Sequence, residues 1–326
     1  MSNIDAGPGS TVETDASQPM PGSSGDADAP RALDSSGQND GADGETNGAA
    51  LCSASNATAS VTAWSPWPMP DPVSTGANAQ RYDLSADVAV DRVTKLEWQR
   101  RVPIDQFDWP GAAGYCSCLT LAGHDDWRLP SRTELVSLVD YTKHDPAIDG
   151  AAFPDTPPLW FWTLSPQAGS DRASAWYVAF FDGDTHHASV DTTYNVRCVR
   201  GPVVADAPAL VVTDATVRDP RTGLTWQRAA APELKTWSEA KSYCDGLVLG
   251  SSPWRLPTMK ELQTIIDENR GDPAIDPTAF PLTTDGGFWA ITPLAGMTGF
   301  MWFVDFASGI AYNSNEDHPY SVRCVQ

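Results

Sequence analysis

The sequence predicts an α+β fold that is built twice in one chain. Motifs recur at a nearly constant offset, helix-capping residues precede amphipathic stretches, and apolar strand patterns close each copy. The offset is 128 residues at the first motif and 126 at the last. A repeat of this length exceeds a solenoid unit of roughly 20–50 residues and fits an independent domain of about 100–150 residues. The paired motifs begin at Trp98 and Trp226, Trp127 and Trp254, Asp145 and Asp272, and Val196 and Val322.

The repeat divides the chain into four parts. Residues 1–63 contain no Phe, Tyr or Trp and are dominated by Gly, Ser, Asp, Ala and Pro. Such a segment cannot bury enough apolar surface to offset the entropy of ordering, so we expect a disordered acidic tether. Residues 64–201 form the first copy with an N-terminal extension, 202–209 a linker, and 210–326 the second copy.

Each copy opens with a hairpin followed by a capped helix. In the first copy, strands at 88–90 and 96–100 flank a turn, and the second copy repeats this arrangement. Thr236 and Glu239 then form a capping box, in which each side chain bonds the backbone of the other residue. Asp108 is the corresponding cap in the first copy. The early cysteine of each copy falls on the apolar face of this helix.

A second helix and a group of strands complete each copy. Capping boxes at 131–134 and 258–261 begin the helix, which we expect to stop before Asp145-Pro146 and Asp272-Pro273. Its buried stripe comprises Leu135, Leu138 and Val139, or Leu262, Ile265 and Ile266. The expected strands are 161–163, 175–181 and 194–199, then 288–290, 301–306 and 320–325.

The six cysteines predict three disulfides. Cys116 aligns with Cys244, and Cys198 aligns with Cys324. One early and one late cysteine in each copy suggest the pairs Cys116–Cys198 and Cys244–Cys324. The remaining pair is Cys52–Cys118, because a bond between Cys116 and Cys118 would close a very small ring. Disulfides indicate an oxidising, exported setting.

Composition excludes several classes of partner. The net charge is −21, and the tether and both copies are all acidic, which argues against nucleic acid and anionic membranes. No apolar run is long enough to span a bilayer. An acidic, Gly/Ser-rich leader is typical of the segment after the lipidated cysteine of bacterial surface lipoproteins. We therefore expect an export signal and a lipid anchor that this chain lacks, and a location at the cell surface, in the periplasm or outside the cell.

The recurring motifs resemble a known family. Trp-Arg-Leu-Pro-(Ser/Thr)-x-x-Glu-Leu, Asp-Pro-Ala-Ile-Asp and the closing Val-Arg-Cys-Val look like the C-terminal domain of the Legionella collagen-like adhesin. The resemblance covers both copies and implies an exported, often lipid-anchored binding module. More distantly, two helices, strands and a disulfide from first helix to last strand resemble the C-type lectin-like fold. The closing motif is also similar to that of the formylglycine-generating enzymes, which share that fold. The adhesin's domain is associated with sulfated polysaccharides, but both copies here are acidic and have no basic run, so that ligand is not carried over.

The shared motifs favour structural roles. Trp127 and Trp254 are expected in the core. The recurring arginines are expected to be buried and paired, locking the second helix to the last strand. Their expected partners are Glu134 and Glu261, or the aspartates of the Asp-Pro-Ala-Ile-Asp motifs. These arginines are Arg128, Arg255, Arg197 and Arg323.

Any binding specificity is therefore expected where the copies diverge, in the loop before each last strand. Oxygen-rich side chains there suit a ligand, and four carboxylates, those of Asp182, Asp184, Glu316 and Asp317, are candidate calcium ligands. A solvated acidic loop is the alternative, since the calcium-site signatures of lectins are missing from the sequence. The candidate ligand-binding residues are Asp182, Asp184, His186, Asp191, Asn195, Asn313, Asn315, Glu316 and Asp317.

These observations predict a non-catalytic binding module that attaches to a glycan or a surface protein through tandem, multivalent sites. Two alternatives remain open. One is a structural envelope protein without a small-molecule ligand. The other is a divergent relative of the formylglycine-generating enzymes, an oxidoreductase-like protein that would need a reactive cysteine. The sequence contains no Gly-x-Ser-x-Gly, His-Glu-x-x-His or phosphate-loop motif.

Overall fold

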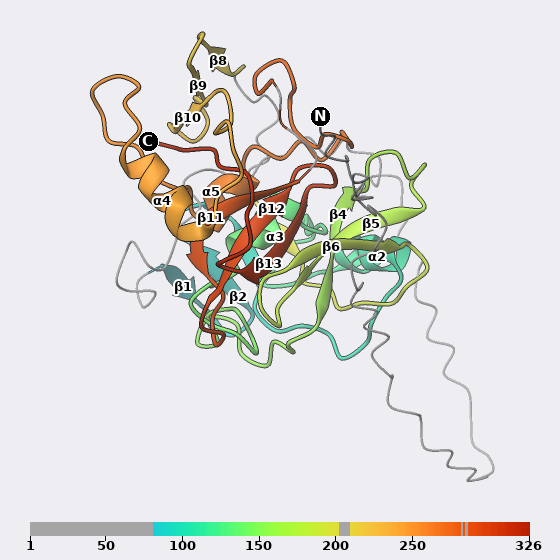
Figure 1. Cartoon of the computed structure of the whole chain (residues 1–326). Coiled ribbons are helices and arrows are strands. Elements are labelled where there is room, and N and C mark those ends of the chain that lie inside the picture. The colour runs from blue at the N-terminus through green and yellow to red at the C-terminus, as the bar shows by residue number, and fades with distance from the viewer. Residues whose placement is uncertain (1–80, 202–208, 282, 284–285) are drawn as a thin grey trace, which may run out of the picture. The chain divides into compact units, whose positions relative to one another are not determined.

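The computed structural model describes residues 81–201, 209–281, 283 and 286–326 (Figure 1). All of them belong to one of the two units into which the chain divides, the unit from Ala50 to Gln326. The predicted tether, and the predicted linker apart from residue 209, lie outside the described residues. None of the helices in the described ranges is long and apolar enough to cross a membrane.

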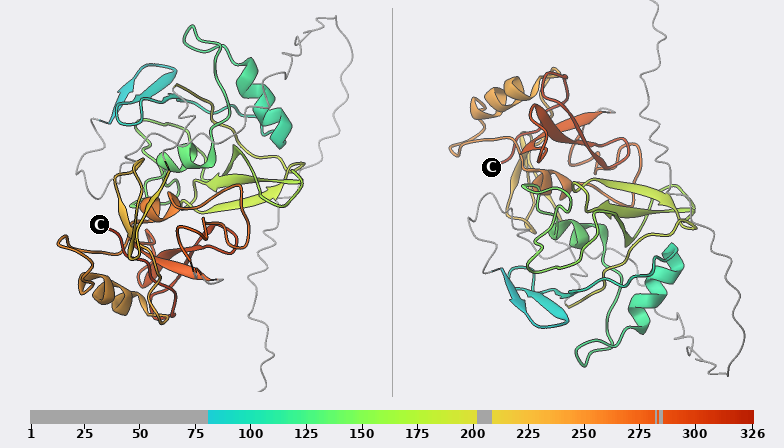
Figure 2. Two further views of the ribbon diagram at one scale, coloured as in Figure 1. Left: turned by 90° about the horizontal axis from the view of Figure 1, so that it is seen from above. Right: turned by 90° about the horizontal axis from the view of Figure 1, so that it is seen from below.

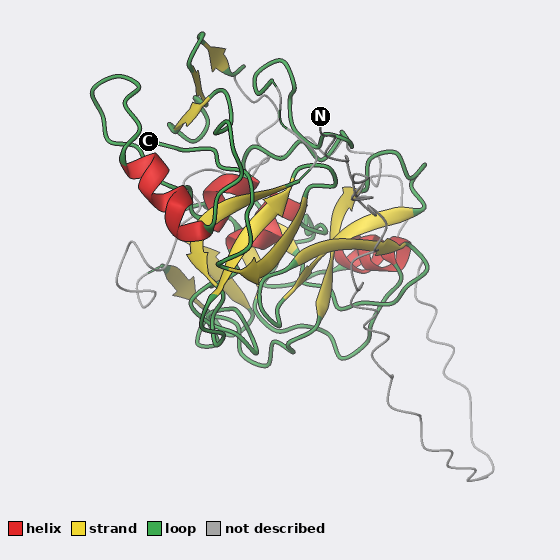
Figure 3. Ribbon diagram, viewed as in Figure 1, coloured by secondary structure: helices red, strands yellow, loops and turns green. Residues whose placement is uncertain are grey.

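The two copies contain the same elements in the same order, except that the short last strand of the first copy has no counterpart in the second. Each has a small antiparallel sheet, two helices and a three-stranded meander. Figure 3 colours the helices red and the strands yellow. The first copy comprises β1 (Tyr82–Leu84), β2 (Val88–Asp91), β3 (Glu97–Gln99), α2 (Trp109–Cys118), α3 (Arg132–Ser137), β4 (Trp160–Pro166), β5 (Ser174–Ala179), β6 (Thr185–Ser189) and β7 (Val199–Arg200). The second comprises β8 (Val211–Val212), β9 (Thr216–Arg218), β10 (Thr225–Gln227), α4 (Trp237–Asp245), α5 (Met259–Gln263), β11 (Gly287–Pro293), β12 (Phe300–Asp305) and β13 (Ile310–Asn315).

The predicted hairpins and helix starts are confirmed. Strand β2 pairs with β3, and β9 pairs with β10, both antiparallel. Asp108 caps α2 by accepting a hydrogen bond from the Gly111 amide. The three predicted capping boxes, before α3, α4 and α5, are all formed.

The second helix of each copy stops before the Asp-Pro motif, as predicted, and is short. Helix α3 ends at Ser137 and α5 at Gln263, well before the Asp-Pro motifs. The Ser137 hydroxyl bonds the Glu134 carbonyl, and Asp140 accepts from the Thr142 amide, so side chains replace the next helical turn. The predicted apolar stripes are nevertheless buried in both copies.

The two meanders join into one six-stranded antiparallel sheet, in the order β11-β12-β13-β6-β5-β4. Strand β6 of the first copy pairs with β13 of the second through Thr185 and Ala311. These residues occupy equivalent positions, because their numbers differ by 126, the offset of the last repeated motif. A pseudo-twofold axis therefore passes between them. In Figure 2 the first copy, cyan to green, and the second, orange to red, lie on opposite sides of this junction.

This junction corrects the prediction for the loop before each last strand. The segments at 185–189 and 310–315 are strands β6 and β13 rather than loops. Conversely, most of the predicted last strand is irregular. Only Val199–Arg200 forms β7 in the first copy, and Val325 makes isolated bridges to Trp226 and Arg255 in the second.

The helices cover the two faces of the sheet differently. Helices α3 and α5 pack against β5 and β12, and the core cluster on this face contains residues of both copies. On the other face, α2 packs against β4 and α4 against β11, at opposite ends of the sheet (Figure 1). The disulfides belong to two separate clusters, one in each copy, that lie under these outer helices.

Candidate functional site

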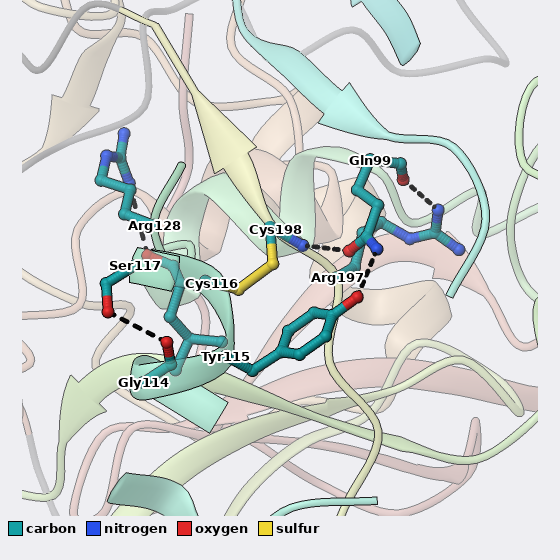
Figure 4. The surroundings of a disulfide bond; sticks show 9 residues. Gln99, Gly114, Tyr115, Cys116, Ser117, Arg128, Arg197 and Cys198 are labelled. Atoms are coloured by element: carbon teal, nitrogen blue, oxygen red, sulfur yellow. Dashed lines mark hydrogen bonds between the residues drawn. A yellow bond between two sulfur atoms is a disulfide. The ribbon is translucent and has the colours of Figure 1, made fainter. Parts of the chain in front are cut away.

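Each copy contains a disulfide next to a buried arginine. Figure 4 shows this arrangement in the first copy. The predicted bonds Cys116–Cys198 and Cys244–Cys324 are both present. Beside the first bond, the Gln99 side chain donates to the Tyr115 hydroxyl at 2.9 Å and accepts from the Cys198 amide at 3.1 Å. The second copy repeats this with Gln227. The first helix and the last segment of each copy are thereby joined covalently and by hydrogen bonds.

The third predicted disulfide remains a prediction. Cys118 is a free, exposed cysteine at the end of α2. Its expected partner, Cys52, lies outside the described residues.

Two of the four recurring arginines have the predicted partners. Arg128 forms a two-bond ion pair with Glu134, at 2.7 and 2.6 Å, and Arg255 forms the same pair with Glu261. Each of these glutamates also completes a capping box. Trp127 and Trp254, which precede these arginines, are buried as predicted.

The other two arginines correct the prediction, because they bind backbone carbonyls rather than carboxylates. Arg197 donates to the carbonyls of Gln99 and Arg100, at 2.7 and 2.9 Å, and lies over the Phe153 ring. Arg323 donates likewise to the carbonyls of Gln227 and Arg228. Both side chains are fully buried, and this burial lowers the pKa of each guanidinium to about 9. They lock the last segment to the hairpin rather than to the second helix.

The predicted ligand-binding residues are divided between the junction and the surface. Asp182 and Asp184 lie in the turn before β6, and His186 lies on β6. Asn195 is buried and donates to the Trp160 carbonyl, so its role is structural. The exposed or partly exposed remainder comprises Asp191, Asn313, Asn315, Glu316 and Asp317.

The candidate calcium ligands are not assembled into a cluster. Across the described ranges, no three His, Cys, Asp or Glu side chains gather in a way that could hold a metal ion. The carboxylates of Asp182 and Asp184 belong to the β5–β6 turn, whereas Glu316 and Asp317 follow β13 in the other copy. Calcium binding thus remains a prediction for which the structure supplies no donor set.

Arg132 is the central polar residue of the junction between the copies. Its Nη2 atom donates to the Thr185 hydroxyl at 3.0 Å, and to two groups of the second copy, the Gln263 side chain and the Gly309 carbonyl. The guanidinium also lies 4.4 Å from the centre of the Trp176 ring. Because Arg132 is buried, its hydrogen bonds and cation–π contact offset the cost of removing a charge from water.

The second copy returns polar contacts across the same junction. Lys260 is buried and donates to the Ser137 carbonyl at 3.1 Å. Gln263 donates to the Tyr141 hydroxyl at 2.8 Å, and that hydroxyl donates in turn to the Gly183 carbonyl. Sequence reasoning missed Arg132 and Lys260, because neither is repeated in the other copy. Met259 is the equivalent of Arg132, and Thr133 is the equivalent of Lys260.

Asp184 is an acid held in an unfavourable environment at the junction. Its Oδ1 atom is shielded from solvent and has no hydrogen-bond partner among the described residues. Burial, reinforced by the nearby Asp182 carboxylate, raises the Asp184 pKa to about 8. The negative charge of Asp184 also helps to raise the pKa of Tyr177 and of Tyr312, one from each copy. Asp184 therefore lies near the aromatic side chains of both copies.

Those side chains belong to a row of six rings that crosses the whole sheet, here called the aromatic row. Each neighbouring pair has its ring centres 5.9–6.5 Å apart. Direct cross-strand pairing places the first three on one face of β4, β5 and β6, and the last three on the same face of β11, β12 and β13. In spatial order the row comprises Trp162, Tyr177, His186, Tyr312, Phe303 and Trp289.

The row is open only at Tyr177, His186 and Tyr312, since Phe303 is buried and its ring stacks on that of Tyr320 at 4.3 Å. Trp162 and Trp289 are fully buried, beneath the segments that lead into α2 and α4. Tyr312 is 38% exposed, and Tyr177 and His186 are partly exposed. The repeat contained a signal for this row, because the rings of Tyr177 and Phe303 are related by the same offset of 126 as His186 and Tyr312.

Comparison with known proteins agrees with this doubled architecture. No curated protein matches the chain. The family model of the Lcl C-terminal domain matches twice, over residues 87–200 and 215–326. Each match begins at the first hairpin, ends with the cysteine-containing last segment, and lies within one of the two structural copies. Since the two matches cover more than half of the sequence, this chain belongs to the Lcl C-terminal domain family of surface-associated domains, in two tandem copies.

Proposed function

We propose that the protein is a non-catalytic, carbohydrate-binding module exported to the bacterial surface, and that the open centre of the aromatic row is its binding site. The single observation that carries this proposal is the row itself, with the partly exposed rings of Tyr177, His186 and Tyr312 on a sheet. Aromatic rings give a binding surface large contact area at low conformational cost. A sugar ring can lie on such a surface through its apolar C–H groups.

The charge around the row supports an uncharged ligand. Asp182 and Asp184 lie close to Tyr177, and their charges act on its hydroxyl. An anionic polysaccharide would be repelled by the net charge of −21. An uncharged sugar would not be repelled, and its hydroxyls can donate to carboxylate oxygens.

We also propose a C-type lectin-like fold for each copy, exported and anchored by a lipid. The disulfide from the first helix to the last segment supports this assignment. Two disulfides in the described residues support an oxidising location. Mass determination of the protein purified from its native membrane fraction would test the anchor. A mature N-terminus without an added lipid mass would contradict it.

A glycan array, probed with the full chain with and without calcium, tests the binding function. We expect uncharged glycans to bind in both conditions, and Tyr312→Ala to abolish the signal. Phe181→Ala is the matched control, since Phe181 is an exposed ring outside the row and its counterpart in the second copy is Ala307. Failure of every glycan to bind would favour the structural envelope protein. Binding that depends on calcium would restore the calcium site.

The oxidoreductase alternative has one specific observation in its favour, the free thiol of Cys118. Among the described residues, the other four cysteines are paired in disulfides, which leaves Cys118 without a second thiol there. Alkylation and mass spectrometry of the native protein would measure whether Cys118 is reduced. A reduced and rapidly alkylated Cys118 at neutral pH would support this alternative.

A further inference from the structure

We infer that the two copies form one composite binding site across their junction, which takes a single chain of an uncharged oligosaccharide. The inference rests on the proposed carbohydrate binding and replaces the expectation of two separate, multivalent sites. It follows from where the open part of the aromatic row lies.

The exposed rings are located around the pseudo-twofold axis rather than within either copy. His186 and Tyr312 occupy equivalent positions, and their ring centres are 6.0 Å apart across the junction. The His186 Nε2 and the Tyr312 hydroxyl are 3.1 Å apart and hydrogen-bonded. Tyr177 and Phe303 continue the row on either side, at 6.0 and 5.9 Å. Phe303 is buried, so the open part consists of the rings of Tyr177, His186 and Tyr312, which cover two interstrand spacings, about 10 Å, and continue across the copy boundary.

The junction holds these rings in place before any ligand binds. Strand pairing at Thr185 and Ala311 fixes the register of β6 against β13. The buried side chains of Arg132 and Lys260 bind across the opposite face of the same junction. A ligand would therefore meet a preformed surface and would not need to bring two domains together, which lowers the entropic cost of binding.

An unpartnered polar atom indicates where the ligand would be hydrogen-bonded. The Oδ1 atom of Asp184 is shielded and has no partner among the described residues, although its charge acts on both Tyr177 and Tyr312. Such an atom is costly unless something supplies the missing bond. A sugar hydroxyl over the centre of the row would supply it.

Isothermal titration calorimetry of the full chain tests the composite site. The probes are hexasaccharides of uncharged β-glucan, xylan, mannan and chitin, each compared with its disaccharide. We expect one bound hexasaccharide per chain and weaker binding of the disaccharide, because the short ligand reaches only part of the row. Tyr177→Ala in the first copy and Tyr312→Ala in the second should each weaken the single event at least about tenfold.

Conservative variants separate stacking from loss of structure. Tyr177→Phe copies Phe303 of the second copy and should retain binding, as should Phe181→Ala outside the row. The thermal unfolding midpoint of each alanine variant, compared with that of the unaltered chain, shows whether it is folded. A folded alanine variant that still binds one hexasaccharide per chain with unchanged affinity overturns the composite site.

The possible failures are distinguishable. Two hexasaccharides per chain, one of which is lost in each alanine variant while the other keeps its affinity, would overturn the composite site and retain the carbohydrate function. No heat of binding with any probe would overturn both. Displacement of a bound hexasaccharide by a synthetic peptide of residues 64–80 would assign the row to the chain's own N-terminal segment and overturn the inference.

Discussion

Removal of either disulfide should destabilise both copies together. The bonded cysteines are separated by 82 residues in the first copy and 80 in the second. On the chain-entropy model, a loop of either length contributes about 4.5 kcal/mol to the free energy of unfolding. For a unit of this size, that loss corresponds to a fall of roughly 9–18 °C in the unfolding midpoint. The apolar cluster beneath the sheet contains residues of both copies, so we expect one cooperative transition rather than two.

Differential scanning calorimetry of two double variants measures this effect. Cys116→Ala with Cys198→Ala, and Cys244→Ala with Cys324→Ala, should lower the same single transition by similar amounts. The unaltered chain under reducing conditions is the control, and it should show the larger, combined loss. Two resolved transitions, only one of which moves in each variant, would refute the shared core and the joined sheet.

Three further predictions concern the junction and the row. Arg132→Met, which introduces the equivalent residue of the second copy, should lower the free energy of unfolding by about 1–3 kcal/mol, because the buried Gly309 carbonyl loses its donor. Urea denaturation measures this loss, and an unchanged midpoint would contradict the buried hydrogen bonds. Because burial raises the pKa of Asp184 in the folded state to about 8, the free energy of unfolding of the wild-type protein should fall as pH rises from about 4 to about 8. Asp184→Asn should remove the part of this fall that Asp184 causes. Equal slopes of unfolding free energy against pH in both proteins would contradict the raised pKa. Gly287→Ala would place a Cβ atom 2.5 Å from the Phe303 ring and should lower the free energy of unfolding by about 1–3 kcal/mol, measured by thermal or urea unfolding. Gly150→Ala, with open space around it, is the control and should have no effect. Equal effects of the two variants would refute the tight packing at Gly287.

Local signals predicted the frame of each copy well. Capping boxes, hairpin turns and the two disulfides depend on residues whose types and spacing are visible in the sequence. The pairing of Arg128 with Glu134 was also readable, because the capping glutamate lies only six residues away. The carbonyl partners of Arg197 are about 100 residues distant in sequence, and no residue type marks a carbonyl as a binding partner.

The candidate site could be predicted only in part, because its key contacts are long-range. Strand β6 and the second half of β13 are rich in polar residues, so their alternation did not distinguish them from loops. Their pairing joins equivalent segments 126 residues apart, and neither copy alone supplies the partner for its own edge. Asp182, Asp184 and His186 were selected as ligand residues because the copies differ there. They lie instead at or beside the junction, where residues that differ between the copies also contact the other copy, as His186 contacts Tyr312.

The buried Arg132 has a consequence for the history of the duplication. Its guanidinium reaches the hydroxyl of Thr185, the residue on the pseudo-twofold axis. Two identical first copies would therefore bring two guanidinium groups together at the axis without water to screen them, and their repulsion would oppose pairing. Met259 in the second copy removes that conflict. The junction therefore fits two unlike halves, and we expect a chain built from two first copies to lose this pairing.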